Sequence, residues 1–481
     1  MLRKVNLLKL FGNEDVNINF AKRSVIITGD NGNGKTTILN TIYNILMGDY
    51  SNILKTYFEK ARVVFDSNFK SMDKIEIRRF KDQNEEKISI KYFHDENLLE
   101  VNLSKNNVQN EVLVENIIKK VDAEEIEIYN DGKNKKQLIN SDRNISLLEI
   151  LTSIDEQFFS EKLKEINKSL LYFPTYRRID LDIDEYYASL FDMPIRAYII
   201  SEQREKNKKF GLYDRRVIGM SNSDIEDILK EYTRTLNEVS SNNLDRLLRD
   251  FTKNTMLEIN SPLSGINTNK LQTVNILNQL KEINESLELE INEDTLKQIS
   301  EQYDEKISVL NQLESKEKES EIETIKAFET LLSVPMMQVL QKLQEAYSNY
   351  NTKMTKALES YSYISENISD FSGNKLKLIK SELNEFYFKK IATSVETFSD
   401  FSTGEKQLIT FLVYSSIELP DDTPSLIIID EPELSLHVKW QNKLIKNLLK
   451  KKNIKVLSAT HSPYIINRRE VDSLVLRKVE G

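Results

Sequence analysis

The sequence feature that most constrains this chain is the nine-residue run 29–37, which reads GDNGNGKTT. It follows an apolar stretch, Ser24–Thr28, that is typical of a buried strand, and it precedes Ile38–Leu46, whose apolar spacing is that of a helix. A strand, a glycine-rich loop ending in Lys-Thr and a helix form the context in which backbone N–H groups surround phosphates. The run therefore predicts a phosphate-binding loop; the alternative is a glycine-rich turn at a strand–helix junction.

Within this loop, we expect Lys35 to reach the β and γ phosphates of ATP and the Thr36 hydroxyl to hold Mg²⁺. The glycines allow tight turns that direct N–H groups inward, and the positive end of the following helix adds to the anion site. The residues expected around the phosphates are Asn31, Gly32, Asn33, Gly34, Lys35, Thr36 and Thr37.

Composition excludes several classes of site. The chain of 481 residues has a net charge of −9, which gives no global argument for binding nucleic acid or an anionic membrane. It contains no cysteine, so disulfides, thiolate metal sites and cysteine nucleophiles are absent. Its three histidines, His94, His437 and His461, argue against a His-rich metal site. Without a signal-peptide pattern or a run of roughly 20 apolar residues, we expect a cytoplasmic protein with no membrane partner.

The first third of the chain predicts mainly strands. Residues 2–28 are interpreted as two strands around a turn at 12–15, ending at the loop. Residues 145–171 predict a helix, and Asp131-Gly132 marks a loop before it. Alternating apolar and polar residues predict an antiparallel meander of four further strands: Ala61–Asp66, Lys74–Phe80, Lys87–Phe93 and Leu98–Leu103.

Two places near the expected nucleotide have alternative interpretations. Phe11 is either a platform for adenine or a core side chain. Residues 171–179 predict a core strand that ends at Arg177 and Arg178. These arginines either contact phosphate or a partner subunit, or they form ion pairs with the acidic run that follows at 180–185.

The middle of the chain predicts helices. Residues 181–250 carry a basic patch, Arg204 to Arg216, which is either a nucleic-acid contact or a solvated face. Residues 270–370 have apolar side chains at helical spacing, from Ile299 to Leu313, and a possible break at Pro335 before a returning helix. We interpret this segment as a short antiparallel helical arm, which either binds a partner or packs as a lid on its own domain.

The last quarter contains a second predicted anion site. The stretch FSTGEKQL, residues 401–408, opens a helix predicted to run through Ile417. Ser402 is a suitable N-cap, and Glu405 three residues later completes a capping box. Small residues at a positive helix end expose N–H groups to an anion, although any capped helix looks similar.

Two further strands are predicted to end in polar side chains. Ser425–Asp430 is a buried, parallel-type strand that ends in Asp430, which suits Mg²⁺, followed by Glu431, which is placed to polarise an attacking water. Lys455–Ala459 is a second core strand, and His461 follows it, where it would contact the γ-phosphate. Paired carboxylates at a strand end can merely start a loop, and a lone histidine is usually structural. The upstream phosphate loop favours a functional role for these three residues.

Four stretches, in this order, resemble the motifs of ABC-type ATPases of the SMC/RecF/OLD group. GDNGNGKTT resembles Walker A, FSTGEKQ the signature, LIIIDEPELSLH Walker B with the D-loop, and ATHSP the switch histidine. The resemblance covers both ends of the chain and matches the middle only loosely. It implies an α/β fold: an ABC-type P-loop NTPase head, with an antiparallel β lobe, a parallel sheet core and an inserted helical arm. The expected division is 1–180 and 391–481 for the two parts of the head and 181–390 for the helical insertion.

The resemblance also implies roles. ATP lies between two heads: Lys35 and Thr36 bind phosphate and Mg²⁺, and Asp430 supports the metal. Glu431 is then the catalytic base, His461 the γ-phosphate sensor, and the signature residues Ser402, Thr403, Gly404 and Glu405 contact the ATP of the other subunit. Phe401 and Thr403 depart mildly from the family pattern, and Gln203 is a candidate for the Q-loop glutamine.

Within this group, LYFPTYRRID, STGEKQLI and DEPELSLHVKWQ resemble ATPase subunits of antiphage systems, first of the PARIS type (AriA-like) and then of the Septu type (PtuA-like). Such ATPases act with a separate nuclease or toxin and respond to a phage-encoded trigger protein. About twenty residues follow His461, fewer than a TOPRIM or HNH nuclease domain needs, so we expect the effector to be a separate protein.

The resemblance therefore implies a regulatory ATPase that forms a dimer of heads or a higher ring. The alternative is a RecF/SMC-like repair ATPase that clamps DNA. The acidic net charge does not favour DNA as a partner, but the patch around Lys208 and the lysines of the last quarter leave this alternative open: Lys439, Lys443, Lys446, Lys450, Lys451, Lys452 and Lys455. The nucleotide subunit of a transporter is a third class, which the meander and the long helical insertion disfavour.

Overall fold

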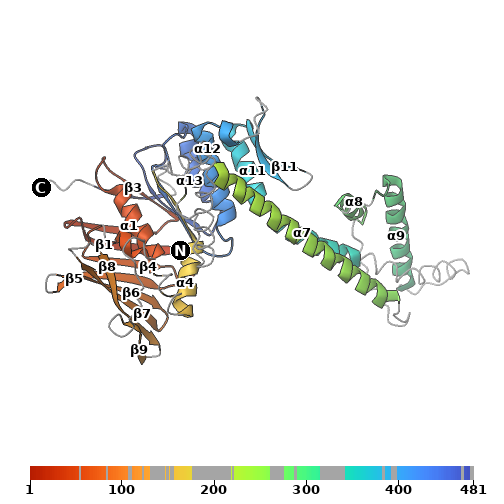
Figure 1. The fold of residues 1–481 in the computed structure, drawn as a ribbon. Helices are drawn as coiled ribbons and strands as arrows, with labels where there is room; N and C mark the ends of the chain where they lie inside the picture. Colours follow the sequence, from red (N-terminus) through yellow and green to blue (C-terminus); the bar gives the residue numbers. More distant parts are fainter. Residues whose placement is uncertain are drawn as a thin grey trace, which may run out of the picture. The chain divides into compact units, whose positions relative to one another are not determined.

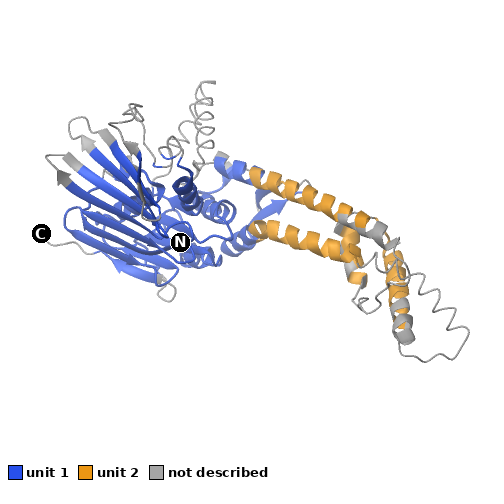
Figure 2. Cartoon of the chain, turned by 90° about the horizontal axis from the view of Figure 1, so that it is seen from below, with its two compact units in different colours: residues 1–230, 363–381, 386–481 blue, residues 231–362, 382–385 orange. Residues whose placement is uncertain are grey.

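The computed structural model describes most of the chain. The described residues are 1–53, 56–82, 85–106, 111–121, 124–130, 147, 151, 156–175, 218, 222–259, 276–286, 290–314, 342–381, 385–391, 398–466 and 471–476. These residues form two compact units, coloured separately in Figure 2. The first consists of residues 1–230, 363–381 and 386–481, and the second of residues 231–362 and 382–385.

The centre of the first unit is a parallel five-stranded sheet. Its strand order is β10 (Leu170–Phe173), β13 (Ser425–Asp430), β14 (Ile454–Ala459), β3 (Ser24–Thr28) and β15 (Val471–Val475). Every pair of neighbours is parallel. Strands β10 and β13 are buried along their whole length, as expected for continuous apolar runs in a parallel sheet. Because β3 pairs with β14 and β15, this sheet joins the beginning of the chain to its last quarter.

The second sheet of this unit is antiparallel and has eight strands (Figure 1). Its order is β2 (Glu14–Asn19), β1 (Leu2–Leu10), β4 (Lys60–Phe65), β5 (Lys74–Asp82), β6 (Glu85–His94), β7 (Asn97–Asn106), β8 (Glu111–Val121) and β9 (Glu124–Asn130). The four-stranded meander predicted from alternation is therefore confirmed, and β8 and β9 extend it. Residues of both sheets and of α1 (Lys35–Met47) share one hydrophobic core.

Two predictions about element boundaries were wrong. Residues 2–28 form three strands rather than two, because β2 ends at Asn19 and β3 belongs to the other sheet. The helix predicted over 145–171 is interrupted at Glu156, which caps α4 (Gln157–Lys168), and it ends at Ser169 because Leu170 starts β10; residues 147 and 151 are helical as predicted. The apolar residues 170–173 satisfy a helical pattern and a buried strand equally well, and pairing with β13 decides between them.

The remaining helices of the first unit follow the predicted motifs. Helix α2 (Tyr50–Ile53) is short, and α12 (Thr403–Val413) continues into a π-helical turn at Tyr414–Glu418. Helix α13 (Val438–Leu448) follows the β13 loop. Helix α11 (Glu359–Ser372) packs beside α13, where Tyr363 donates to the Asn447 carbonyl and Asp370 pairs with Lys443. A hairpin of β11 (Leu376–Lys380) and β12 (Phe386–Lys390) and a 3₁₀ turn at Phe398–Asp400 precede α12.

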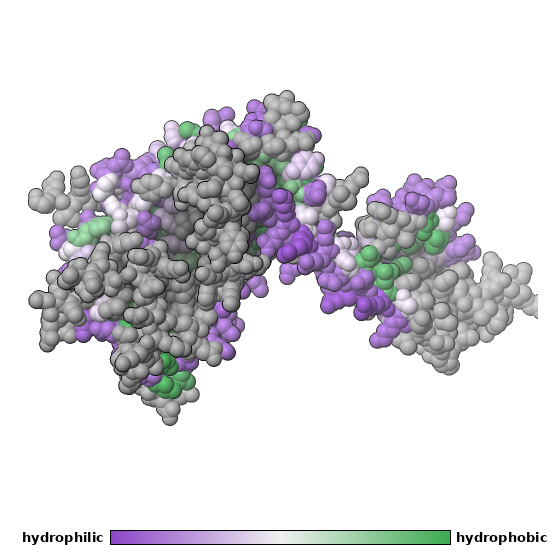
Figure 3. Space-filling model, in the orientation of Figure 1, coloured by the Kyte–Doolittle hydropathy of each residue, from purple (hydrophilic) through white to green (hydrophobic). Residues whose placement is uncertain are grey.

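The second unit is helical, and its main feature is an antiparallel pair. Helix α7 (Asn222–Ile259) supplies one member, and residues 342–357 supply the other, lying alongside it in Figure 2. Tyr232 donates to the Ala357 carbonyl near one end, and Leu247 and Tyr347 share a small core farther along. The face of α7 seen in Figure 3 is largely hydrophilic. The unit also contains α8 (Ile276–Ser286) and α9 (Glu293–Glu314).

An inserted helical arm is therefore confirmed, but its outgoing helix is α7, which begins well before the predicted 270. The predicted helix at 299–313 is part of α9, and the proposed break at Pro335 lies outside the described residues. Among the helices that the structure describes, none has the length and apolar character needed to cross a membrane.

Candidate active site

The predicted site residues converge at one edge of the parallel sheet. Strands β3, β13 and β14 end there, and they are followed respectively by the glycine-rich loop, by Glu431 and by Thr460-His461. The carboxyl ends of parallel strands are where ligands bind in open α/β sheets. The fold thus brings together Lys35, Thr36, Asp430, Glu431 and His461, which are far apart in the sequence.

Lys35 is the first residue of α1 and is only 6% exposed. Its ammonium donates to the carbonyls of Gly29 at 3.0 Å and Asp30 at 2.8 Å, so it lies inside the loop. Burial lowers the pKa of Lys35 below its ordinary value, while the carboxylates of Glu431 and Asp430 oppose that effect. A cation held in this way is placed to bind an anion that enters the loop.

Asp430 is 3% exposed and accepts two hydroxyl hydrogen bonds on the same oxygen. Its Oδ2 accepts from Thr36 Oγ1 at 2.8 Å and from Thr175 Oγ1 at 2.5 Å. Its Oδ1 is buried and has no hydrogen-bond partner in the part of the chain that the structure describes. A buried carboxylate oxygen without a partner, beside a threonine hydroxyl, matches the oxygen ligands that Mg²⁺ prefers, so these residues fit the predicted metal.

Glu431 and His461 face each other across the ends of β13 and β14. Glu431 Oε1 lies 3.9 Å from His461 Nε2, and both side chains are about one-third exposed, at 28% and 35%. Glu431 has a left-handed backbone, with φ of 48°, and its N–H donates to the Ala459 carbonyl at 2.8 Å. A non-glycine residue at positive φ is costly and occurs often at functional sites, so the fold holds this carboxylate in a defined position.

The sequence interpretation missed two side chains of this edge, Glu433 and Thr175. Glu433 accepts hydrogen bonds from Thr460 Oγ1 at 2.7 Å, from the His461 N–H at 2.6 Å and from the Ser462 N–H at 3.1 Å. Thr175 follows β10, which pairs with β13 and so places it beside Asp430. The available signal was position alone, because each of these residues lies within three residues of the end of a core strand.

The remaining loop residues lie at the surface of the same edge. Asn31 and Gly32 are exposed, Gly32 and Gly34 have left-handed backbones, and Thr37 accepts from Thr41 through its carbonyl. The Asn33 side chain donates to the Leu476 carbonyl at 3.3 Å.

Phe11 lies against this loop. Its side chain is 48% exposed, and a Cβ added at Gly34 would lie 2.5 Å from its ring. The core interpretation of Phe11 is therefore wrong, and stacking on adenine stays a prediction.

The signature residues form a separate group at the start of α12. The predicted capping box is confirmed: Ser402 Oγ accepts from the Glu405 N–H, and Glu405 accepts from the Ser402 N–H at 2.8 Å. Burial opposes ionisation of Glu405, but the Ser402 N–H and the Lys390 ammonium outweigh it and hold the pKa of Glu405 below its ordinary value. Thr403 begins the helix and is partly exposed.

Gly404 packs closely on the loop after Walker B. A Cβ added there would lie 2.4 Å from the Ser435 carbonyl oxygen and 3.9 Å from the Trp440 ring. The absence of a side chain at this position therefore lets the helix start approach the D-loop within one chain.

Several predicted contacts lie outside the described residues: Arg177, Arg178, the Q-loop candidate Gln203 and the patch from Arg204 to Arg216. Three lysines of the last quarter of the chain, by contrast, form ion pairs within the chain. Lys443 pairs with Asp370, Lys451 with Asp421 and Lys455 with Asp66. Intramolecular partners thus neutralise three of the charges that would favour a DNA-binding surface.

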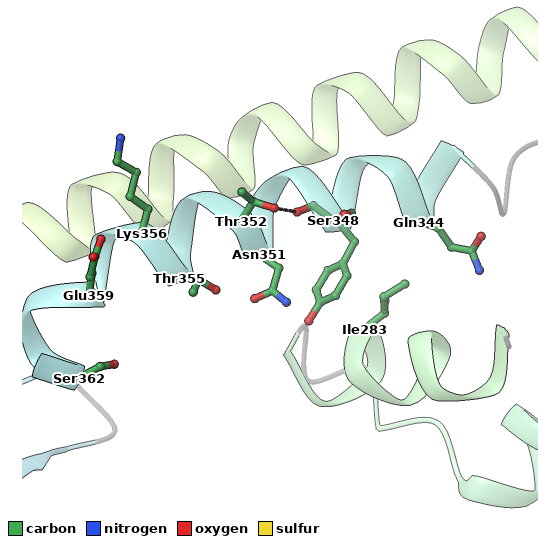
Figure 4. Close-up of a pocket in the computed structure, with 10 residues that line it drawn as sticks. Ile283, Gln344, Ser348, Asn351, Thr352, Thr355, Lys356, Glu359 and Ser362 are labelled. Atoms are coloured by element: carbon green, nitrogen blue, oxygen red, sulfur yellow. Dashed lines mark hydrogen bonds between the residues drawn. The ribbon is translucent and has the colours of Figure 1, made fainter. Parts of the chain in front are cut away.

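The helical unit has a cavity of its own, of about 590 Å³. Figure 4 shows the side chains that line it, most of them on the helix at 342–357, with Ile283 of α8 opposite. Gln344, Ser348, Asn351 and Thr355 follow one another at helical spacing, so the lining is largely neutral and polar. The cavity contains none of the residues predicted from the motifs.

Comparison with known proteins found a family model and a curated relative. A family model described as "AAA domain, putative AbiEii toxin, Type IV TA system" matches residues 24–467. The Retron Vc95 probable ATPase of Vibrio cholerae serotype O1 biovar El Tor is 26% identical over 142 residues, and the match spans 27% of each chain.

Solved structures of Smc head domains were also found. One from Pyrococcus furiosus, with an extended coiled coil and bound to the C-terminal domain of ScpA, has a TM-score of 0.36 at 13% identity, covering 99% of this chain and 94% of that one. One from Pyrococcus yayanosii, with a coiled coil and joint, has a TM-score of 0.34 at 13% identity, covering 99% and 95%.

The family match covers well over half of the chain and includes the loop, both sheet-end carboxylates and His461. The parallel core, the antiparallel lobe and the helical insertion are the parts of an ABC-type P-loop NTPase head. The chain therefore belongs to the AAA_21 family, whose model is described as an AAA domain.

Proposed function

We propose that this chain binds ATP with Mg²⁺ at the edge formed by β3, β13 and β14, and hydrolyses it slowly in a regulatory role. One observation carries the proposal: Lys35, Thr36, Asp430, Glu431 and His461 come from three strand ends and meet at one place. The buried Lys35 and the Asp430 oxygen, which has no hydrogen-bond partner among the described residues, supply a cation and an anion that complement a magnesium nucleotide. Magnesium would neutralise charge on the phosphates and orient them.

Each side chain of the site has its own role in the proposed reaction. Lys35 and the N–H groups of residues 31–37 hold the phosphates, and Thr36 and Asp430 hold the metal. Glu431 acts as general base on the attacking water, and His461, 3.9 Å away, contacts the γ-phosphate and keeps that water in line. Phe11 supplies a face for the adenine ring beside Gly34.

The signature group supports a paired assembly. Ser402, Thr403, Gly404 and Glu405 form a capped helix start that is separate from the loop, and we propose that it completes the ATP site of a second copy of the chain. Two heads would then enclose two nucleotides, as a dimer or as part of a higher ring. ATP shifts the equilibrium toward the closed pair only by its difference in affinity for the closed and open forms.

The biological role that we propose is defence against phage. The family description names a toxin–antitoxin toxin, and one relative is a retron ATPase. With the resemblance to PARIS-type and, second, Septu-type ATPases, these similarities support a sensor and scaffold that holds a separate nuclease or toxin until a phage-encoded trigger arrives. The helical arm, in which α7 has a largely hydrophilic face, is the part that we propose contacts the effector.

The proposal is tested by measuring assembly mass with three proteins: wild type, Glu431→Gln and Lys35→Ala. Mass photometry with and without ATP and Mg²⁺, alone and with the product of the adjacent gene, should show an ATP-stabilised complex for Glu431→Gln and none for Lys35→Ala. Equal assembly sizes for the two variants would contradict the proposal. An ATP-dependent pair that ignores the neighbouring gene product but binds duplex DNA would instead support the DNA clamp.

A further inference from the structure

We propose that Glu433 is a positioning residue that holds His461 in place for hydrolysis; the inference rests on the proposed ATPase function. Glu433 lies two residues beyond Glu431 in the loop after β13, yet its carboxylate reaches the loop after β14. Its Oε1 accepts from the backbone N–H groups of His461 and Ser462, at 2.6 and 3.1 Å, and its Oε2 accepts from Thr460 at 2.7 Å. One side chain thus binds three consecutive residues, 460–462, of the loop after β14, which we call the histidine loop.

The two carboxylates of this loop differ in their contacts. Both oxygens of Glu433 are engaged in hydrogen bonds, so this carboxylate is poorly placed to take a proton from water. Glu431 faces His461 at 3.9 Å and is the better base. A general base acts on the water, whereas Glu433 acts through the backbone that carries His461.

Contacts with β3 and α13 also hold the histidine loop, in addition to those made by Glu433. Thr460 is fully buried, and its N–H donates to the Ile27 carbonyl of β3 at 3.1 Å. Ser462 Oγ donates to Gln441 of α13 at 2.7 Å, and Gln441 donates to the Leu436 carbonyl at 2.8 Å. His461 itself is about one-third exposed, so the packing of its ring alone does not fix it. The Glu433 carboxylate contacts the His461 backbone directly.

This geometry predicts that replacing Glu433 slows ATP hydrolysis but leaves the affinity for ATP nearly unchanged. Displacing a catalytic group by about 1 Å can reduce the rate on the order of 100-fold without touching the substrate. Glu433→Ala should therefore lower kcat by about 10- to 100-fold and change the Kd for ATP by less than about threefold. Glu433→Gln should recover most of kcat, because the amide oxygen still accepts from the His461 and Ser462 N–H groups.

The experiment is a double-mutant cycle with a structural control. Single-turnover hydrolysis and ATP affinity would be measured for Glu433→Ala, His461→Ala and the double variant. If Glu433 acts through His461, the double variant should hydrolyse ATP as slowly as His461→Ala alone. Glu156→Ala is the control: Glu156 caps α4 and pairs with Lys119, so its loss should lower stability but leave kcat unchanged.

A second measurement needs no hydrolysis. The chain has only three histidines, so a spectrum of protein labelled at histidine Cε1 should contain three signals, assigned by substitution. Without nucleotide, Glu433→Ala should shift and broaden the His461 signal and leave those of His94 and His437 in place, and Glu433→Gln should restore it.

Failure of the positioning role and failure of the proposed ATPase function would give different results. Additive losses in the cycle, or a His461 signal in Glu433→Ala identical to that of wild type, would overturn the positioning role. Hydrolysis that survives Lys35→Ala would overturn the ATPase site itself, whatever the histidine spectrum shows.

Discussion

Thr36 Oγ1, in the first turn of α1, donates a 2.8 Å hydrogen bond to Asp430 Oδ2 at the end of β13, 394 residues later in the chain. Thr175 donates to the same oxygen, and the other oxygen of Asp430 is buried without a partner in the described residues. The candidate metal site therefore combines both ends of the chain, and it exists only when β3 and β13 are in one sheet.

We expect Thr36→Val to weaken the binding of Mg²⁺ that accompanies ATP binding. Removing the hydroxyl takes away a metal ligand, and a lost partner of a buried polar group costs about 1–3 kcal/mol, so the half-saturating Mg²⁺ concentration should rise about tenfold. Calorimetric titration with and without a chelator measures this. Thr41→Val is the matched control, because Thr41 lies on the same helix but its hydroxyl donates to the Thr37 carbonyl. Equal shifts for the two variants would contradict a ligand role.

Phe11→Ala should lower the affinity for ATP but not for inorganic triphosphate. The ring is half exposed beside Gly34, and stacking of a base on an aromatic side chain contributes about 1–3 kcal/mol, so at least a fivefold loss is expected. Competition binding with both ligands would measure the difference. Tyr57→Ala, an equally exposed aromatic, serves as the control. A parallel loss for triphosphate would mean that Phe11 only supports the loop.

Gly404→Ala should loosen the D-loop despite favouring helix formation. In an open helix this change stabilises by about 1 kcal/mol, but here the new Cβ would lie 2.4 Å from the Ser435 carbonyl oxygen. Hydrogen exchange at Leu434 and Leu436, whose N–H groups donate to Glu431 and Glu433, should become faster. Thr403→Ala adds no Cβ and should leave exchange there unchanged. Slower exchange in Gly404→Ala would refute the steric argument.

Glu405→Gln should cost up to about 1 kcal/mol of stability at neutral pH, because the amide still caps the helix but loses the negative charge that pairs with Lys390 and favours a helix N-terminus. Because the folded pKa of Glu405 is lowered, its contribution is present above the unfolded value of 4.5 and is lost as pH falls through the folded value. The difference between wild type and Glu405→Gln should therefore shrink below about pH 4.5 in denaturation followed by circular dichroism. Ser402→Ala, which removes a group that does not titrate, should show a smaller dependence on pH.

Local patterns in the sequence predicted the parts of the site that depend on neighbouring residues. The glycine-rich loop, the capping box at Ser402 and the strand ending in Asp430 each have a signature within about ten residues. The order of these motifs also implied that the two ends of the chain form one head, which the pairing of β3 with β14 confirms.

Contacts that depend on packing between distant segments could not be predicted in this way. Nothing near Glu433 in sequence indicates that its carboxylate reaches Thr460, since that depends on the spacing of β13 and β14. Likewise, apolar periodicity identified α9 as a helix but could not show that α7 pairs with residues 342–357. Helical spacing shows which side of a helix is apolar, but the neighbouring helix that packs on that side depends on how the side chains of both helices interdigitate.

Trp440 is the only tryptophan in the chain, and it lies close to the start of α12 and to α11. Its ring is next to Gly404 of the signature, close to the loop that contains Ser435, and edge-to-face with Phe371 of α11 at 6.4 Å. Fluorescence excited at a wavelength where tyrosine does not absorb therefore comes from this side chain alone. With no native cysteine, a single introduced thiol can carry an acceptor dye. The molecule thus contains a built-in optical donor for following the signature and α11 in real time.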